Sequence, residues 1–171
     1  MKQFSFWKNP RPHHGGAQAQ GKRKCARPLT TKNPMHVVLK SSRARGEWSF
    51  LRHAGVVEGK VRATAKKFEI RVLRYQNVGN HLHLAIQGRR RRDLQNFFRV
   101  VAQAIAYSVT GARRGKPVGK FWDALVFTRI VQWGRDWRNL GTYFEKNFWE
   151  AKGMPRDVVD LWFEIGKTPI G

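Results

Sequence analysis

Hydrophobic and polar residues alternate along several short stretches of the chain, and this alternation predicts four β-strands. The stretches are residues 35–40, 70–75, 81–87 and 125–133. Because side chains on a strand point alternately to opposite faces, each stretch offers an apolar face to a core. Residues 76–79 turn the chain between the second and third stretches. So short a connection predicts that these two strands form an antiparallel pair.

Apolar residues spaced three or four positions apart predict helices around these strands. The first helix is expected over about residues 56–68, where Gly59 weakens the helical preference. The second opens at the arginine run 89–92 and stops at Gly111, a residue type that commonly ends helices. Its buried stripe is expected to be Leu94, Phe97, Phe98, Val101, Ile105 and Val109.

The C-terminal part of the chain carries two more helical patterns. A long helix is expected to begin near Asp136, a good N-cap residue. Its buried stripe would be Trp137, Leu140, Phe144, Phe148 and Ala151. A glycine and a proline at 153 and 155 break this helix, and a short amphipathic helix follows over residues 157–165. The apolar side of that last helix is Val158, Leu161, Trp162 and Ile165.

The elements follow one another as strand, helix, strand, strand, helix, strand and helix. This is the split β-α-β order of the ferredoxin-like class, an α+β fold with an antiparallel sheet, here with additional C-terminal helices. We expect this domain over residues 35–151 and a helical tail over residues 152–171. Residues 1–34 contain eight Lys or Arg, no acidic residue and no periodicity, so they are expected to form a basic N-terminal arm.

The charge of the chain narrows the choice of partner. A formal charge of +23, from 34 basic and 11 acidic residues, favours polyanions and nucleic acid in particular. No apolar run approaches the length of a membrane span, so no membrane partner is expected. The single cysteine, Cys25, allows no internal disulfide and no cysteine zinc cluster, and a cytoplasmic location is expected.

Two histidines stand on one side of the third predicted strand. His81 and His83 lie opposite Leu82, Leu84 and Ile86. Residues i and i+2 are about 7 Å apart on a strand, so both imidazoles can reach one metal ion. The alternative is a half-buried strand with two solvated histidines.

Other histidine and nucleic-acid signatures fit less well. The RRM pattern of a basic residue, glycine and closely spaced aromatics is absent. A histidine-triad nucleotide hydrolase would need a third histidine where the chain has Ala85. The two-histidine phosphoesterases need two His-x-Ser/Thr motifs, and the chain has none.

A metal-assisted attack on a phosphate also needs an oxygen nucleophile. The chain has three tyrosines, Tyr75, Tyr107 and Tyr143. Tyr143 shares a predicted helix face with Asn147, one turn away, whose carbonyl oxygen could bind the ion. Such a pair is also common at plain interfaces. The candidate DNA contacts are Arg89, Arg90, Arg91, Arg92, Arg113 and Arg114, and a solvated charge run is the alternative for the first four.

The stretch from Asn80 to Leu84, Asn-His-Leu-His-Leu, resembles the HUH motif of the single-tyrosine transposases, the insertion-sequence and REP-associated enzymes. In that family the nucleophilic tyrosine lies on a late helix, four residues before a Gln or Asn, as Tyr143 and Asn147 do here. The turn from Gly119 to Trp122 is also similar. The resemblance covers about residues 35–151.

The resemblance implies a homodimeric DNA nuclease and strand transferase that depends on Mg2+ or Mn2+. It would act on hairpin-bearing single-stranded DNA, with Tyr143 as nucleophile, and His81, His83 and Asn147 as metal ligands. Many family members have Gln at the position of Asn147, so Glu150 and Gln87 are alternative third ligands. A DNA-binding relative without cleavage activity and a basic structural nucleic-acid-binding protein remain the alternative functions.

Overall fold

Five strands form one antiparallel sheet in the order β1-β5-β2-β4-β3. The computed structural model describes residues 13–16 and 26–165. The strands are β1 (His13–His14), β2 (Met35–Lys40), β3 (Ile70–Asn77), β4 (His81–Gly88) and β5 (Phe127–Ile130). Every neighbouring pair is antiparallel. Without β1 this is the strand order of a ferredoxin-like sheet, so the expected fold class is confirmed.

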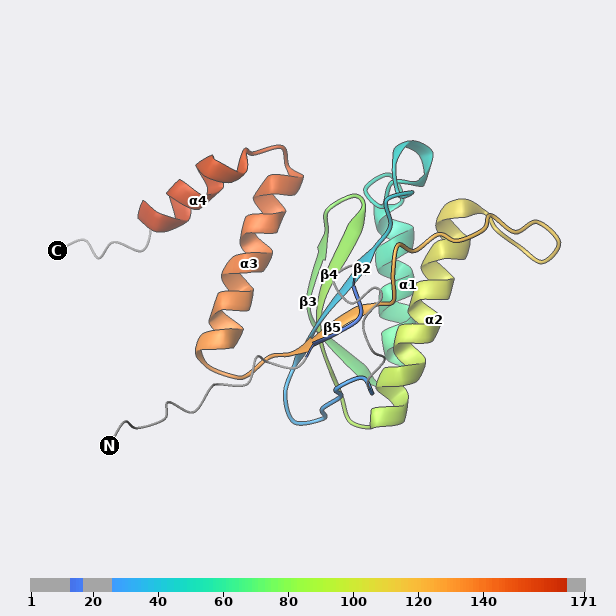
Figure 1. Ribbon diagram of the computed structural model, residues 1–171, viewed down its shortest axis with the longest axis horizontal. Coiled ribbons are helices and arrows are strands. Elements are labelled where there is room, and N and C mark those ends of the chain that lie inside the picture. The colour runs from blue at the N-terminus through green and yellow to red at the C-terminus, as the bar shows by residue number, and fades with distance from the viewer. Residues whose placement is uncertain (1–12, 17–25, 166–171) are drawn as a thin grey trace, which may run out of the picture.

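Four α-helices flank the sheet within the described residues. They are α1 (Ala54–Lys67), α2 (Arg91–Thr110), α3 (Arg135–Ala151) and α4 (Arg156–Ile165), and a 3-10 turn at Gly46–Trp48 precedes α1. Figure 1 shows α1 and α2 side by side on one face of the sheet and α3 on the opposite face, with α4 beyond α3. The sheet is therefore covered by a helix pair on one side and by one helix on the other.

The larger core lies between the sheet and the pair α1 and α2. Alternate residues of β2 face Leu82, Leu84 and Ile86 of β4, and all are almost fully buried. The predicted stripe of α2 is buried against them. Gly111 ends α2 in the left-handed conformation, with φ of 68° and its N–H donated to the carbonyl of Tyr107. The periodicity of the strands and of α2 therefore predicted this core correctly.

The opposite face of the sheet has a much smaller core. Ala85 of β4 packs there with Val131, Leu140 and Phe144, which are buried, and the partly buried Leu73 and Trp137 adjoin them. Because α3 alone covers this face, the part of the sheet that α3 does not reach stays accessible. His36 and His83, by contrast, lie where α3 meets the sheet and are almost fully buried against Tyr143 and Phe144.

Several expectations about the C-terminal half are corrected. The fourth strand is shorter than predicted, Phe127–Ile130 instead of 125–133. The N-cap of α3 is Gly134, because the Asp136 carboxylate instead accepts hydrogen bonds from Arg129 and from the backbone N–H of Gln132. The buried face of α3 is also rotated toward Asn147, so Phe148 is 39% exposed.

The expected apolar side of the tail helix is largely exposed. Val159 is the buried residue of α4, whereas Val158, Leu161, Trp162 and Ile165 are open to solvent. α4 packs mainly on α3, and most of its residues are exposed. None of the helices in the described part of the chain has the length and apolar composition of a membrane span.

The arm was expected to be free of regular structure, and one part of it departs from that expectation. His13 and His14 pair with Arg129 and Thr128 of β5 and so add the short strand β1 to the edge of the sheet. Gly15 and Gly16 follow in positive-φ conformations. A Cβ at position 15 would lie 2.2 Å from the carbonyl oxygen of Val126, so the close approach requires glycine there. The remaining residues of the arm up to 12, and 17–25, lie outside the described part.

Candidate functional site

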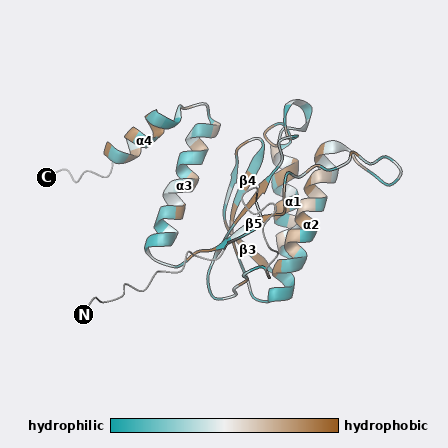
Figure 2. Ribbon diagram, in the orientation of Figure 1, coloured by the Kyte–Doolittle hydropathy of each residue, from teal (hydrophilic) through white to brown (hydrophobic). Residues whose placement is uncertain are grey.

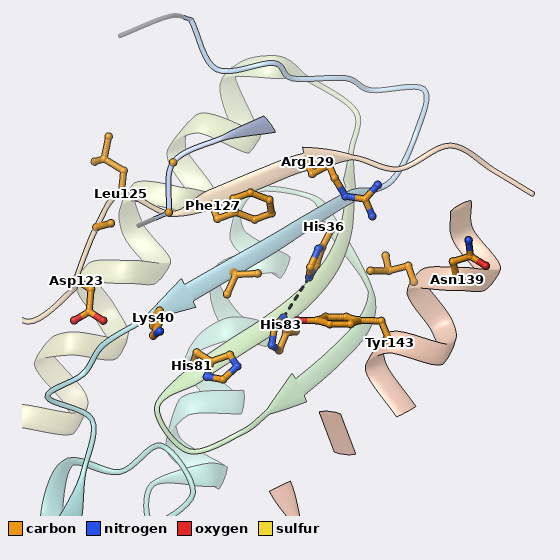
Figure 3. Close-up of a pocket in the computed structure, with 15 residues that line it drawn as sticks. His36, Lys40, His81, His83, Asp123, Leu125, Phe127, Arg129, Asn139 and Tyr143 are labelled. Carbon is orange, nitrogen blue, oxygen red and sulfur yellow. Dashed lines mark hydrogen bonds between the residues drawn. The ribbon is translucent and has the colours of Figure 1, made fainter. Parts of the chain in front are cut away.

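A cavity of about 620 Å³ opens where β2, β4 and β5 meet α3 (Figure 3). Three imidazoles and a phenol line it, together with further polar and apolar side chains. The residues that line it are His36, His81, His83, Tyr143, Val38, Lys40, Asp123, Ala124, Leu125, Phe127, Arg129, Asn139, Leu140, Gly15 and Gly16. Its size exceeds that of a metal ion and leaves room for part of an organic substrate.

The period-two prediction for the third strand is confirmed by the placement of its histidines. His81 and His83 both line the cavity, and their ring centroids are 4.7 Å apart. Nδ1 of His81 is 2.6 Å from Oδ1 of Asn80, so this nitrogen donates its proton and Nε2 keeps a lone pair. His83 is 2% exposed, and its Nε2 has no hydrogen-bond partner among the described residues.

A third histidine joins them, and the sequence analysis did not single it out. His36 of β2 lies with Nε2 at 3.3 Å from Nδ1 of His83, and the two rings are stacked with centroids 5.5 Å apart. The strand register brings this about, because Val38 pairs with His83 and His36 with Ala85. Alternation alone put His36 on the face opposite Val37 and Leu39, and the ferredoxin-like order makes the first and third strands neighbours. Together these two signals could have found it.

Burial makes all three imidazoles poor bases. Desolvation, together with the neighbouring His81 and His36, lowers the pKa of His83 to about 3. Desolvation lowers the pKa of His36 to about 4, with Arg129 acting in the same direction and Asp136 opposing it. The pKa of His81 is also lowered, mainly by burial and then by Lys40. The rings are therefore neutral near pH 7, which is the state in which imidazole binds a metal ion.

Tyr143 of α3 faces this cluster. Its ring centroid is 5.2 Å from that of His83 and 5.7 Å from that of His36, both in edge-to-face contact. In Figure 3 the phenol ring points from the helix toward His83. Tyr143 is 40% exposed, so a substrate can reach it from solvent. The structure thus brings the predicted nucleophile together with two of the three predicted metal ligands, His81 and His83, within one chain.

The other two tyrosines lie elsewhere. Burial raises the pKa of Tyr75 to about 12. Such a phenol ionises with difficulty and is a poor nucleophile. Tyr107 is 53% exposed on α2, which covers the opposite face of the sheet. Neither residue lines the cavity.

An ion pair positions the helix that carries Tyr143. Arg129 of β5 donates to both carboxylate oxygens of Asp136, at 3.0 and 3.1 Å, and Asp136 is buried in the first turn of α3. One turn later Leu140 packs on Ala85 of β4. These contacts fix the start of α3 against the sheet and so determine where Tyr143 lies.

Asn147, the predicted third metal ligand, lies outside the lining of the cavity. Its amide donates to the backbone carbonyl of Tyr143 at 2.6 Å. The alternative ligands Glu150 and Gln87 do not line the cavity either. No cluster of three or more His, Cys, Asp or Glu side chains within residues 13–16 and 26–165 is arranged to hold a metal ion. In this structure the chain therefore offers two candidate ligands, His81 and His83, and the third remains a prediction.

These two histidines suit a transition-metal ion. The buried Nε2 of His83 has no partner in the described part of the chain, and Asn80 orients His81 as an outer-shell residue commonly orients a metal-binding imidazole. Imidazole nitrogen is a good ligand for transition ions, whereas Mg2+ prefers oxygen. Of the two expected ions, Mn2+ is therefore the better match to the donors present.

The predicted DNA-binding arginines form two separate groups, at the two ends of α2. Residues 89–92 precede and open the helix, and residues 113 and 114 lie in a loop beyond its C-terminus. A helix of 20 residues spans about 30 Å. All six arginines are exposed, and none lines the cavity. Figure 2 shows the loop as a hydrophilic stretch that extends away from the sheet.

No family model matches the sequence, and no curated protein matches it. Among solved structures, the chain is similar to a crystal structure from Deinococcus radiodurans R1 that is provisionally named a transposase. The sequence identity is 14%, over 73% of this chain and 98% of the other, and the TM-score is 0.45. Similarity at this level supports no inference about function. The function proposed below therefore rests on the geometry of the cavity.

Proposed function

We propose that the protein is a metal-dependent transposase-like endonuclease that cleaves and rejoins hairpin-bearing single-stranded DNA through Tyr143. The observation that carries the proposal is the edge-to-face contact of Tyr143 with His83, at 5.2 Å between ring centroids, in the lining of the cavity. A partly exposed phenol beside two neutral imidazoles combines a nucleophile with ligands for a cation.

The proposed reaction is a phosphoryl transfer. The phenolic oxygen of Tyr143 attacks the scissile phosphorus, the bond from phosphorus to the 3′ oxygen breaks, and a 5′-phosphotyrosine forms. The phenol proton passes to solvent water, and the departing 3′ oxygen takes up a proton to become a 3′-OH. Reversal by a 3′-OH rejoins DNA without ATP, because one phosphodiester is exchanged for another.

A bound Mn2+ or Mg2+ would polarise the scissile phosphate and stabilise the charge that develops on it. His81 and His83 are the residues that would hold it. The protein contributes the orientation of both rings, through Asn80 on one and burial on the other. The position of Tyr143 on α3 brings the nucleophile into the lining of the same cavity.

The substrate class follows from charge. A net charge of +23 and two exposed arginine groups favour a polyanion, and cleavage at a cavity of this size requires a strand that can leave a duplex. We propose that the two arginine groups bind the phosphates of a hairpin stem while the adjoining single strand enters the cavity. Because one chain holds both His83 and Tyr143, cleavage can take place within a single subunit, and a homodimer would contain two such sites.

A covalent-trapping experiment tests the proposal. The probe is a pool of synthetic DNA hairpins with random single-stranded flanks, labelled at the 3′ end, with Mn2+ or with EDTA. A 5′-phosphotyrosine retains the 3′ part of the DNA, so the label should move with the protein in a denaturing gel. A pool labelled at the 5′ end should instead release shorter free fragments.

Two phenylalanine variants locate the nucleophile. Tyr143→Phe should abolish the labelled protein band, because it removes the oxygen and keeps the ring that packs on His83. Tyr107→Phe is the matched control on the other face of the sheet and should keep the band. If the wild-type protein binds the pool but forms no adduct with Mn2+, the protein is a DNA-binding relative without cleavage activity. An adduct that persists in Tyr143→Phe places the nucleophile elsewhere.

A further inference from the structure

His36 and His83 make the closest contact between ring nitrogens in the cluster. Nε2 of His36 lies 3.3 Å from Nδ1 of His83, as the dashed line in Figure 3 marks, and the rings are nearly parallel, with 18° between their planes. Facing nitrogens at this distance share one proton, because two N–H groups would repel each other and two lone pairs would form no bond. One ring is therefore the donor and the other the acceptor.

Which of the two rings donates determines whether Nε2 of His83 can bind a cation. If His36 donates, the proton of neutral His83 must sit on Nε2, and that nitrogen cannot bind a cation. If His83 donates from Nδ1, its Nε2 keeps the lone pair. Nε2 is buried and has no hydrogen-bond acceptor among the described residues. An N–H at that position would be left without a partner, whereas a lone pair is available to a metal ion.

We infer that His36 is a positioning residue that accepts the Nδ1–H of His83 and so holds His83 in the tautomer whose Nε2 faces the cavity as a metal ligand. The inference deepens the proposed function and rests on it for the role of the metal. The tautomer assigned to His83 does not depend on a bound metal ion, so it can be tested in the metal-free protein.

The surroundings of His36 suit this role. The residue is 7% exposed, and its ring is in contact with the rings of Phe127, Phe144 and Tyr143, at centroid distances of 6.0, 5.9 and 5.7 Å. These rings come from β5 and α3, so His36 is enclosed from both sides and its orientation is fixed. A fixed acceptor is what is needed to select one tautomer of its partner.

Nitrogen NMR of the metal-free protein, with labelled histidine, reports the tautomer of each ring directly. In the wild type, His83 should carry its proton on Nδ1. His36→Leu removes the acceptor and keeps an apolar side chain, so His83 should shift toward a mixture of tautomers or toward Nε2–H. His36→Gln supplies an amide oxygen that can accept the same proton and should restore the Nδ1–H form. His53→Gln, at the N-cap of α1, is the matched control and should leave His83 unchanged.

Binding of Mn2+ to the same proteins is the second measurement, followed by the loss of the free-ion electron paramagnetic resonance signal. Loss of an outer-shell partner typically weakens metal binding about 10- to 100-fold. His36→Leu should fall in that range, and His36→Gln should recover most of the affinity. Urea unfolding of each variant records the structural effect separately, because a purely structural role would lower the midpoint without changing the tautomer.

Two outcomes would overturn the inference. The first is a wild-type His83 that carries its proton on Nε2. The second is a folded His36→Leu variant that keeps both the Nδ1–H tautomer and the Mn2+ affinity of the wild type. Failure of the proposed function gives a different pattern. In that case the wild type has the expected tautomer but binds no Mn2+, so the proton assignment stands and the metal-dependent activity does not.

Discussion

Nη1 of Arg129 donates to both carboxylate oxygens of Asp136, at 3.0 and 3.1 Å, and this ion pair joins β5 to the first turn of α3. Asp136 also accepts the backbone N–H of Gln132 at 2.9 Å, so one buried carboxylate fixes both the strand and the connection to the helix. The helix that carries Tyr143 depends on this carboxylate for its position, because on this face only a small core holds α3 to the sheet.

Asp136→Asn should therefore lower both stability and cleavage. Asparagine keeps one acceptor oxygen but removes the charge, and a hydrogen bond to a charged group contributes about 1.5–3 kcal/mol. We expect a loss of about that size in the free energy of unfolding, measured by urea denaturation. Asp157→Asn, at an exposed position in the first turn of α4, is the control and should change it by less than about 0.5 kcal/mol. Equal effects of the two variants would contradict the role given to Asp136.

The sequence correctly predicted the strands that face the larger core, because burial there requires regularly spaced apolar residues. β2 and β4 have one face buried by α1 and α2, so apolar residues recur at every second position of that face, and the strand bounds were nearly correct. β5 and α4 were predicted less well. Only four residues of β5 pair as a strand, and α4 contacts little besides α3, so its apolar residues do not mark a buried face.

The placement of the candidate residues was predicted where it depended on local spacing and missed where it depended on strand register. His81 and His83 are two residues apart on one strand, so their common face follows from the pleat. His36 reaches them through the register of β2 on β4, which no local pattern contains. The role of Asn147 depends on the rotation of α3 about its axis, and the buried Asp136 helps to set that rotation.

Two glycine substitutions should change stability in opposite directions. At Gly88 an added Cβ would lie 2.7 Å from Cδ1 of Ile70 and 2.9 Å from Cγ of the fully buried Leu94. Gly88→Ala should therefore lower the free energy of unfolding by about 1–3 kcal/mol through overpacking. Gly59 is exposed inside α1 with nothing within 4 Å, so Gly59→Ala should raise it by about 0.5–1 kcal/mol. Thermal or urea unfolding of both variants measures the difference in sign.

The arginine groups should determine the salt dependence of DNA binding. Arg90 already lies 3.8 Å from Glu69 and 3.6 Å from Asp93, so we expect Arg89 and Arg92 to contact phosphate more effectively. The double variant Arg89→Gln and Arg92→Gln should lower the slope of log K against log salt by about 1.4–1.8, since each phosphate contact contributes about 0.7–0.9.

Fluorescence anisotropy with a labelled hairpin, at several salt concentrations, measures that slope. Arg113→Gln with Arg114→Gln should lower it by a similar amount if the loop beyond α2 binds the same stem. Arg62→Gln is the control, because Arg62 lies on α1 and is paired with Glu58 at 2.6 Å. A slope that stays constant in both double variants would mean that these arginines are solvated and take no part in binding.

Acid should destabilise the protein through its buried histidines. The pKa of His36 is lowered from 6.5 to about 4 and that of His83 to about 3, chiefly by burial. Between these values and pH 6.5 the unfolded chain binds protons that the folded protein does not, so stability is complete above about pH 6.5 and falls as the pH decreases. At pH 5 the loss should be about 2 kcal/mol for each ring.

Urea midpoints at pH 7.5 and pH 5 measure this loss. Both pH values lie above about 4, the ordinary pKa of most carboxyl groups, so the histidines dominate the difference. His36→Gln removes one of the three imidazoles whose pKa is lowered by burial and should reduce the difference between the midpoints by roughly a third to a half. His53→Gln is the control, since His53 lies at the N-cap of α1 outside the cavity, and it should leave the difference unchanged. If the wild-type midpoints at the two pH values agree, the histidine cluster is hydrated in solution, and the burial that keeps its rings neutral is absent.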